Sequence, residues 1–287
     1  MSRVIQQSSR FAAITGAGSG LGRDIALGFA AKGYRVFGTA IAPEEITDLQ
    51  QASGGAVTLT SCDITEEPAV GRWARAVSAQ TGGGLNLLIS NAGILTPGPI
   101  ETLPLDSIRR EFDVNVFGAL SVVNGFLPAL RKAQGRIVQV STWTASLPLP
   151  FNGPSGASKA AMEVFAAVFR AELKRFGIDV VVAVAGNMRT GGPAKTATAL
   201  VDVTKRMTSE ERGLYGQAFD TFAARLNSMQ GEGLASSDAA NRVIELAEQI
   251  PAPRFAPVGQ DAEEILRAVR ERSDEQLDAL RLQLVGL

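Results

Sequence analysis

A glycine-rich turn near the start of the chain carries the clearest chemistry in the sequence. The segment TGAGSGLG, residues 15–22, follows a short apolar run and leads directly into residues with helical periodicity. Glycine permits a tight turn and lets backbone N–H groups approach a phosphate closely. A helix that begins inside the turn adds free N–H donors and a positive dipole end. A plain strand–helix turn is the alternative, but the context is the one that a dinucleotide pyrophosphate site requires.

The absence of histidine limits the remaining chemistry. The 287 residues include no histidine and one cysteine, Cys62. These counts exclude Ser–His and Cys–His catalysis, histidine-based metal sites and an intramolecular disulfide, and we expect no bound metal. The net charge of −1 gives no attraction toward nucleic acid or an anionic membrane.

The sequence also carries signals about location. The first ten residues lack the apolar stretch of a signal peptide. No run approaches the roughly 20 apolar residues of a transmembrane helix. We therefore expect a cytoplasmic protein with no membrane span and no nucleic-acid partner.

Strand and helix patterns alternate through the first two-thirds of the chain. Helices are expected between the strands, including long ones at 105–131 and 155–176. This repetition predicts a parallel sheet with right-handed crossovers. We expect an α/β, doubly wound (Rossmann) fold, with 1–287 as a single domain. The predicted strands are 11–15, 34–40, 56–60, 85–90, 135–141 and 178–185.

Residues 191–233 interrupt this rhythm with additional helical sequence. An insertion after the carboxyl end of a strand lies where doubly wound folds bind ligands. We therefore predict a helical substrate lid within the same domain. A helix at 236–249, a strand at 254–258 and a helix from about residue 261 complete the chain.

Several segments occur together in the order and spacing of one family. The first glycine, the third and the fourth of the turn are spaced as G-x-x-x-G-x-G. With this spacing the sequence resembles the short-chain dehydrogenase/reductase family, strongly over residues 10–190 and loosely beyond them. The matching segments are TGAGSGLG (15–22), CDIT (62–65), NAG (91–93), the asparagine of FDVNVFGAL (112–120), VST (140–142), SxxxK (155–159) and GNMRT (186–190).

The resemblance implies a complete site for NAD or NADP. It implies that Gly16, Gly20 and Gly22 hold the pyrophosphate. It also implies that Asp63 accepts a hydrogen bond from the adenine amino group, with Ile64 beside the ring. For Asp63 a helix N-cap is an alternative or additional role. The other residues that the resemblance assigns to the cofactor are Ser19, Leu21, Asn91, Ala92, Gly93, Lys159 and Thr190.

The choice between NAD and NADP stays open. An acid at the end of the second strand binds the ribose hydroxyls of NAD, and an arginine nearby pairs with the 2′-phosphate of NADP. Ala40 and Ile41 stand at those positions. Arg23 could approach a phosphate, although a solvated helix charge is the simpler interpretation.

The resemblance also implies hydride transfer between the nicotinamide and a carbonyl carbon. In the family a tyrosine carries the proton, and a lysine four residues later lowers its pKa and holds the ribose. A serine 13 residues before the tyrosine polarises the carbonyl, and an asparagine supports a water. Lys159, Asn115 and Thr142 stand at three of these positions, but Ser155 replaces the tyrosine. These four residues are our candidate catalytic set.

Ser155 weakens this chemistry. A phenol titrates near 10 and can be tuned by a cation, whereas an aliphatic hydroxyl is shorter and a poor acid–base group. Losing such a group typically costs about 10²- to 10⁴-fold in rate, although a water could relay a proton from Lys159. Three interpretations remain: an engineered Tyr→Ser variant, a natural lyase or isomerase on the same scaffold, and a dinucleotide-binding protein without catalysis.

Each candidate also has a structural interpretation. Lys159 shares a helix stripe with Glu163 and could be solvated, while Asn115 could bond to the local backbone. Thr142 could simply end a strand, and Ser155 could be a helix N-cap. The joint spacing of the four residues favours function.

The predicted substrate contacts are apolar. FNGP, residues 151–154, and the insertion after residue 190 resemble the steroid and retinol dehydrogenase branch, which implies a small hydrophobic secondary alcohol or ketone. Family members commonly pair the helices at 105–131 and 155–176, which implies a homodimer or homotetramer. We expect the substrate to meet Trp143, Leu149 and Met188, with a rim that includes Leu147, Phe151, Phe219 and Phe222.

Overall fold

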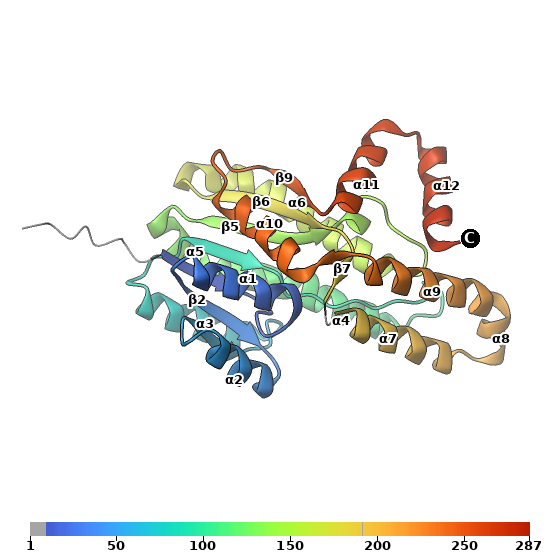
Figure 1. Cartoon of the computed structure of the whole chain (residues 1–287), viewed down its shortest axis with the longest axis horizontal. Coiled ribbons are helices and arrows are strands. Elements are labelled where there is room, and N and C mark those ends of the chain that lie inside the picture. The colour runs from blue at the N-terminus through green and yellow to red at the C-terminus, as the bar shows by residue number, and fades with distance from the viewer. Residues whose placement is uncertain (1–9, 191) are drawn as a thin grey trace, which may run out of the picture.

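A seven-stranded sheet organises the chain, of which this computed structural model describes residues 10–190 and 192–287 (Figure 1). The strand order is β3-β2-β1-β4-β5-β6-β9, and every neighbouring pair is parallel. This arrangement confirms the predicted doubly wound α/β fold. The strands are β1 (Arg10–Ile14), β2 (Tyr34–Ala40), β3 (Val57–Ser61), β4 (Leu87–Ser90), β5 (Arg136–Thr142), β6 (Asp179–Ala185) and β9 (Phe255–Val258).

Helices cover both faces of the sheet. One apolar core joins the sheet to α1 (Gly20–Ala31), α2 (Pro43–Ala52) and α10 (Ser236–Glu248). The other joins it to three helices on the opposite face, where the Trp73 and Phe126 rings meet edge to face at 4.7 Å. Every residue of β4 is buried, as expected for a strand covered on both sides. The helices of the second face are α3 (Glu67–Gln80), α5 (Ala119–Ala133) and α6 (Gly153–Leu173).

The sheet order reverses between β1 and β4. From β1 the chain moves outward to β2 and β3, and it then returns to β4 on the other side of β1. The connections on the two sides diverge at this point and leave a crevice at the carboxyl ends of the strands, where doubly wound folds bind their ligands.

The predicted helix at 105–131 contains a change of helical pitch. It consists of α4 (Leu105–Phe112), a π-helical segment (Asp113–Gly118) and α5. The stretch Leu105–Ala133 is long enough to cross a membrane and holds an 18-residue window with a mean hydropathy of 1.3, so the expectation of no such stretch was wrong. A buried core helix passes the same test, and 56% of the apolar window is buried inside this protein.

The inserted segment, which the sequence predicts to be a lid, is helical and lies beyond the carboxyl ends of the strands (Figure 1). It contains α7 (Gly192–Arg206), α8 (Ser209–Glu211), a π-helical turn (Arg212–Gly216) and α9 (Gln217–Gly231). Two short parallel strands that the sequence did not predict, β7 (Met188–Arg189) and β8 (Leu234–Ala235), pair at its base. Gly191, where the predicted insertion begins, lies outside the described residues.

Two helices, rather than the one predicted, end the chain. They are α11 (Gln260–Glu271) and α12 (Asp274–Val285). Ser273 separates them because it forms a capping box with Gln276 at the start of α12. The last helix packs against α9 and so ties the end of the chain to the lid.

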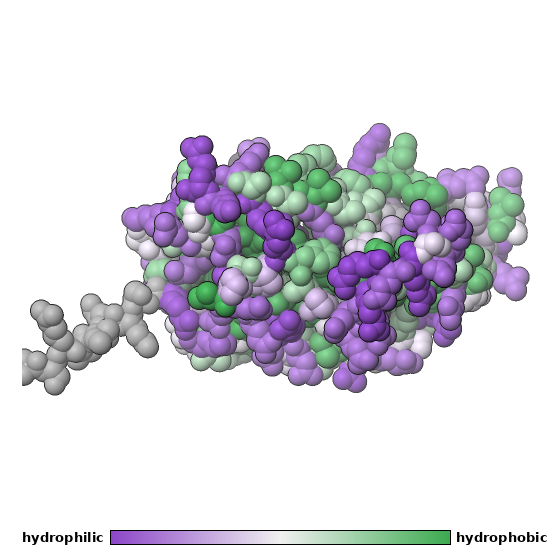
Figure 2. Space-filling view, turned by 90° about the horizontal axis from the view of Figure 1, so that it is seen from above, coloured by the Kyte–Doolittle hydropathy of each residue, from purple (hydrophilic) through white to green (hydrophobic). Residues whose placement is uncertain are grey.

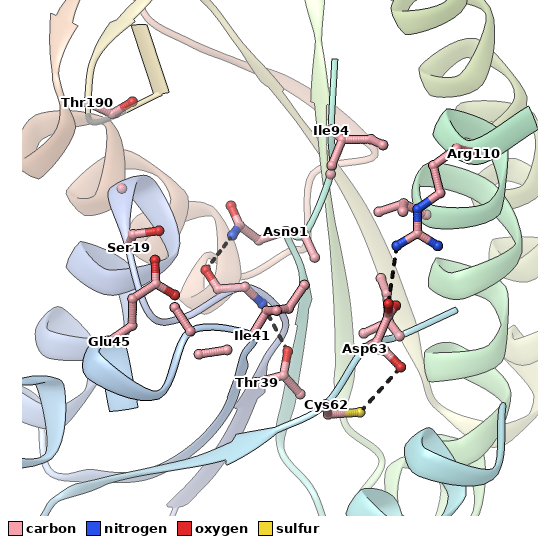
Figure 3. Close-up of a pocket in the computed structure, with 18 residues that line it drawn as sticks. Ser19, Thr39, Ile41, Glu45, Cys62, Asp63, Asn91, Ile94, Arg110 and Thr190 are labelled. Atoms are coloured by element: carbon pink, nitrogen blue, oxygen red, sulfur yellow. Dashed lines mark hydrogen bonds and ion pairs between the residues drawn. The ribbon is translucent and has the colours of Figure 1, made fainter. Parts of the chain in front are cut away.

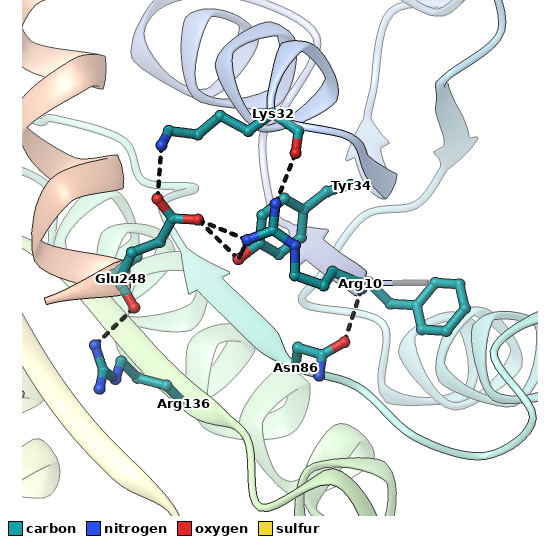
Figure 4. A network of polar contacts seen from close by, with 8 residues as sticks. Arg10, Lys32, Tyr34, Asn86, Arg136 and Glu248 are labelled. Carbon is teal, nitrogen blue, oxygen red and sulfur yellow. Dashed lines mark hydrogen bonds and ion pairs between the residues drawn. The ribbon is translucent and has the colours of Figure 1, made fainter. Parts of the chain in front are cut away.

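A polar network closes the amino end of the sheet, away from the crevice (Figure 4). The Arg10 guanidinium donates to Glu248 Oε1 at 3.1 Å and to the Lys32 carbonyl at 2.7 Å. Glu248 also accepts from the Tyr34 hydroxyl at 3.0 Å and pairs with the Lys32 ammonium at 2.8 Å. Burial and the hydrogen bond to Glu248 raise the pKa of Tyr34 to about 12. Arg136 lies beside this network and donates to three carbonyls at the end of α10.

The surface mixes polar and apolar side chains. On the face shown in Figure 2, hydrophilic side chains surround smaller groups of apolar ones. Among the exposed apolar residues are Phe117 in the π-helical segment, 62% exposed, and Val164 on α6, 65% exposed. The π-helical segment and α6 therefore carry apolar side chains into solvent.

Candidate active site

The glycine turn joins β1 to α1 and has the geometry of an anion site. Gly16 and Gly20 adopt φ angles of +63° and +53°, in the left-handed region that favours glycine. A Cβ on Gly22 would lie 2.1 Å from the Gly16 carbonyl oxygen, so only glycine lets α1 pack against the turn. The N-cap Ser19 makes no side-chain capping bond, which leaves the first N–H groups of α1 free for a pyrophosphate.

Neighbouring strands hold the turn in place. Thr39 at the end of β2 accepts a hydrogen bond from the Gly16 N–H at 3.1 Å. The Asn91 amide donates to the carbonyls of Thr15 and Gly16, and the Thr15 hydroxyl accepts from the N–H groups of Asn91 and Ala92. Asn91 therefore fastens the end of β4 to the turn, which is a structural task beside its predicted contact with the ribose.

A cleft of about 570 Å³ extends from this turn across the ends of β1, β2 and β4 (Figure 3). Leu21 and Gly22 follow in α1, and the Leu21 side chain belongs to the core rather than to the cleft. Sequence reasoning missed Thr39, Glu45, Ile94 and Arg110, which also line the cleft, because nothing local in the sequence directs them there. The cofactor residues predicted from the sequence that line it are Gly16, Ser19, Gly20, Asp63, Ile64, Asn91, Ala92, Gly93 and Thr190.

Asp63 lies at the far side of the cleft. Its carboxylate accepts from the backbone and hydroxyl of Thr65 at 2.9 and 2.7 Å and pairs with Arg110 at 3.1 Å. Burial alone would raise the pKa of Asp63, but the bonds from Thr65 and the Arg110 guanidinium hold that pKa below its usual value. Glu66, not Asp63, is the N-cap of α3, so the predicted capping role was wrong.

A smaller pocket of about 190 Å³ adjoins the cleft. Thr142, at the end of β5, and Ser155, in the first turn of α6, both line it, together with the predicted substrate residues Trp143, Leu149 and Met188. Thr190 lines both the pocket and the cleft, so the two cavities meet there.

The two hydroxyls of the pocket differ in their surroundings. Thr142 Oγ1 accepts from the N–H and the hydroxyl of Thr144, each at 3.4 Å, and no hydrogen bond among the described residues uses the proton of Thr142 itself. Ser155 is 9% exposed and is not the N-cap of α6, a position that Asn152 takes. The N-cap interpretation of Ser155 was therefore wrong.

Asn115 lies in the π-helical segment and is 1% exposed. Its amide donates to the Ile94 carbonyl at 3.0 Å and accepts from the Ile94 N–H at 2.8 Å. It also donates to Ser158 Oγ at 3.0 Å, one residue before Lys159. A Cβ on Gly93 would lie 3.1 Å from Asn115 Oδ1 and 3.3 Å from Lys159 Nζ, so both atoms border the same glycine of the cleft.

Lys159 lies near two acidic residues, the buried Glu111 and the half-buried Glu163. Its ammonium donates to the Val140 carbonyl at 3.1 Å. Burial lowers the pKa of Lys159, although the negative charges of Glu111 and Glu163 act to raise it. The solvated-face interpretation of Lys159 and Glu163 is wrong, because both residues are only partly exposed, Lys159 donates to a carbonyl of β5 and Glu163 accepts from Ser141 at 2.6 Å.

Glu111 is a buried acid that sequence reasoning missed. It is 0% exposed, accepts from the Thr96 N–H at 2.8 Å and contacts the Asn115 amide at 3.3 Å. Burial raises the pKa of Glu111 to about 7, although the Thr96 bonds and the Lys159 charge oppose this rise. Its spacing of four residues from Asn115 was the available signal, since two such residues share a helix face.

A sequence profile described as short chain dehydrogenase matches residues 10–200. The chain belongs to this family. It is 30% identical to dehydrogenase/reductase SDR family member 9 of Bos taurus over 91% of this chain and 83% of that protein. It is 32% identical to retinol dehydrogenase 5 of Mus musculus over 75% and 69% of the two chains. These matches support the predicted family and an NAD(P)-dependent dehydrogenase/reductase.

Solved structures of the short-chain dehydrogenase family share the fold. A short-chain dehydrogenase from Streptomyces avermitilis superposes with a TM-score of 0.77 at 23% identity, covering 98% of this chain and 97% of the other. One from Burkholderia cenocepacia, described in complex with NADP, gives 0.71 at 25% identity over 98% and 99% of the two chains. The family therefore fits a nicotinamide dinucleotide, NAD or NADP, and the glycine turn of this chain has the free donors to hold one.

The lid of this short-chain dehydrogenase contacts the pocket with fewer residues than predicted. Phe219 and Phe222 are fully buried and pack around Phe151, with ring centroids 5.5 to 5.9 Å apart. Leu147 is buried in the same core, so these four residues anchor the lid and do not line the pocket. Tyr215, the lid tyrosine, hydrogen-bonds to Glu101 outside the pocket.

Proposed function

We propose that this chain interconverts a small secondary alcohol and its ketone with a nicotinamide dinucleotide, and that Ser155 makes this reaction slow. The observation that carries the proposal is the meeting of the cofactor cleft and the reaction pocket at Thr190. Thr142 lines the pocket, and Lys159 borders Gly93 of the cleft. A substrate carbon in the pocket would therefore face the end of the cofactor cleft at Thr190.

The protein residues divide the work of the reaction. When bound, the nicotinamide supplies or accepts the hydride. Thr142 donates a hydrogen bond from its hydroxyl to the substrate oxygen and so stabilises the negative charge that develops there. Lys159 binds the ribose, and Asn115 positions the segment at Ile94 and the hydroxyl of Ser158 next to that lysine.

The proton itself comes from Lys159 rather than from Ser155. A serine hydroxyl is a poor acid near neutral pH. Burial lowers the pKa of Lys159, which brings this amine closer to the pH at which general acid–base catalysis is efficient. Because Ser155 is shorter than tyrosine, a water beside its hydroxyl can carry the proton from the lysine to the substrate.

The pocket favours a small substrate with both an apolar and a polar part. About 190 Å³ is below the usual range of roughly 300–1,000 Å³ for ligand pockets. Trp143, Leu149 and Met188 supply the apolar contacts. Asn152 and Gln230 line the pocket, and their buried Oδ1 and Oε1 atoms have no hydrogen-bond partner among the described residues. Buried acceptors of this kind call for a donor, so the substrate carries a hydroxyl or amino group besides the reacting carbon.

The variant Ser155→Tyr tests the reaction. We expect it to raise the rate of reduced-nicotinamide formation or consumption by about 10²- to 10⁴-fold on a panel of small alcohols and ketones. Ser155→Phe fills the same space without a hydroxyl and excludes the relay water, so it should not raise the rate and should lower it below that of the parent chain. Near-ultraviolet circular dichroism checks that both variants remain folded.

Two outcomes would argue against the proposal. If Ser155→Tyr and the parent chain both bind the cofactor but reduce and oxidise nothing in the panel, the oxidoreductase function fails and a binding protein without turnover remains. If neither protein binds NAD(H) or NADP(H) in a saturable titration, the cofactor site itself is refuted.

We further propose a homodimer or homotetramer formed through α5 and α6, in the cytoplasm. Phe117 and Val164 expose most of their apolar surface on this side, and exposed apolar patches mark association sites. Light scattering of the parent protein and of Val164→Asp tests the assembly, because a charge at this interface should dissociate the oligomer and lower the measured mass. A reducing compartment suits Cys62, the only cysteine of the sequence.

A further inference from the structure

An acidic side chain enters the cofactor cleft from an element that was not expected to supply one. Glu45, on α2, lines the cleft together with Ser19 of the glycine turn (Figure 3). A Cβ on Gly18 would lie 2.4 Å from Glu45 Oε2 and 2.8 Å from the Glu45 Cβ. Gly18, which the predicted pyrophosphate contacts do not use, therefore makes room for this carboxylate.

The Glu45 carboxylate has no protein partner among the residues that the structure describes. No hydrogen bond or ion pair of the described residues includes it, and both the basic residue of α1 and the basic residue that lines the cleft pair with other acids. Arg23 pairs with Asp48 at 2.8 Å, and Arg110 pairs with Asp63 at 3.1 Å. This part of the cleft therefore presents a half-buried, uncompensated negative charge.

The position of Glu45 matches a known chemical need. In doubly wound nucleotide sites the adenosine ribose lies at the carboxyl end of the second strand, where an acid binds the ribose hydroxyls of NAD. In this chain Ala40 ends β2 and Ile41 follows it, so neither an acid nor an arginine stands there. Glu45 lies only four residues beyond Ile41 and brings a carboxylate back to the same end of the cleft.

We propose that Glu45 makes this protein select NAD(H) over NADP(H). Its carboxylate accepts hydrogen bonds from the ribose hydroxyls of NAD, which are charge-assisted and therefore strong. NADP carries a phosphate at the 2′ position, and two negative groups held close together in a partly desolvated cleft repel each other. The proposal rests on the cofactor site described above, but it does not depend on turnover.

The expected selectivity is large enough to measure by binding alone. A like-charge contact across a partly buried site changes affinity by about 10²-fold. Because part of that repulsion is screened by salt, the ratio of the two dissociation constants should shrink as ionic strength rises.

The experiment titrates the purified chain with NADH and with NADPH and follows nicotinamide fluorescence. We expect NADH to bind about 100-fold more tightly than NADPH. Glu45→Gln keeps the shape of the side chain but removes the charge, so it should tighten NADPH binding at least tenfold and weaken NADH binding a few-fold. Glu44→Gln is the matched control, because Glu44 precedes it on α2 and is exposed outside the cleft.

Each result decides the proposal. A parent chain that binds both cofactors equally, or a ratio that Glu45→Gln leaves unchanged, overturns the role of Glu45 while the cofactor site stands. An equal effect of Glu44→Gln would show that the general charge of α2 acts, and not the position of Glu45. Binding of neither cofactor would refute the cofactor site itself, and the selection by Glu45 with it.

Discussion

Replacing Gly22 by alanine tests whether the turn depends on close contact between α1 and the backbone of Gly16. The added Cβ would lie 2.1 Å from the Gly16 carbonyl oxygen, 2.9 Å from its carbon and 2.6 Å from Asn91 Nδ2. Two of these atoms are backbone and the third belongs to the amide that fastens β4 to the turn, so none can move aside without displacing the cofactor cradle.

The magnitude follows from two opposing effects. Alanine within a helix is favoured over glycine by up to about 1 kcal/mol, whereas overpacking a tight site costs about 1–3 kcal/mol and sometimes more. We expect a net loss of about 2 kcal/mol, which corresponds to a fall in Tm of about 4–8 °C for a chain of this size. Because the turn must shift, NADH affinity should fall at least tenfold.

Gly28→Ala is the matched control on the same helix. There a Cβ would meet only the flexible end of Ile244, at 2.4 Å from its Cδ1. This variant should lose some thermal stability but keep its affinity for NADH in a fluorescence titration. If Gly22→Ala binds NADH as tightly as the parent chain, or both variants lose affinity equally, the reasoning about the turn is refuted.

Three further predictions concern the rest of the fold. Folding raises the pKa of Glu111 from 4.5 to about 7. The contribution of this group to the free energy of unfolding is therefore complete below pH 4.5 and is lost as the pH rises through about 7. Glu111→Gln should therefore flatten the change in unfolding free energy between about pH 5 and about pH 8 by up to ~3 kcal/mol, and an unaltered pH profile in denaturant titrations would contradict this assignment. Arg136→Ala removes the donor that caps three carbonyls at the end of α10 and should lower Tm by about 4–8 °C in calorimetry; a shift below about 1 °C would rule the cap out as a major contributor. Trp73→Phe should cost less than about 1.5 kcal/mol in urea unfolding even though the ring is 2% exposed, because the buried indole N–H has no partner to lose, and a cost of about 3 kcal/mol or more would show that packing dominates.

The sheet and the cofactor turn could be predicted because their signals are local. Each strand is a short apolar run between turn residues, and Gly33 and Gly177 mark helix ends by their positive φ angles. The glycines at 16 and 20 report a backbone shape directly. Asn115, Thr142 and Lys159 could be found because their spacing along the chain matches that of the family which the sequence resembles.

Glu45 and Glu111 show where this reasoning ends. An acid on a helix is usually solvated, and only the angle at which α2 leaves β2 directs Glu45 toward Gly18. Glu111 is buried two residues before the helix changes pitch at Asp113–Gly118, and neither feature has a strong signal in the sequence. The prediction that Phe219 and Phe222 lie at the rim of the substrate site was wrong for a related reason. Apolar character indicates that a side chain is buried, but it does not indicate whether the side chain contacts a ligand or a neighbouring helix.

The network of Arg10, Lys32, Tyr34 and Glu248 has a consequence for how this protein can change over generations. It clamps the amino ends of the strands, while the cleft and the reaction pocket occupy the opposite ends. Mutations at the pocket therefore leave this anchorage intact, and the fold can survive the loss of a side chain as central as the one that Ser155 replaces. A scaffold of this kind tolerates trials of new chemistry, because an unsuccessful trial abolishes an activity without abolishing the protein.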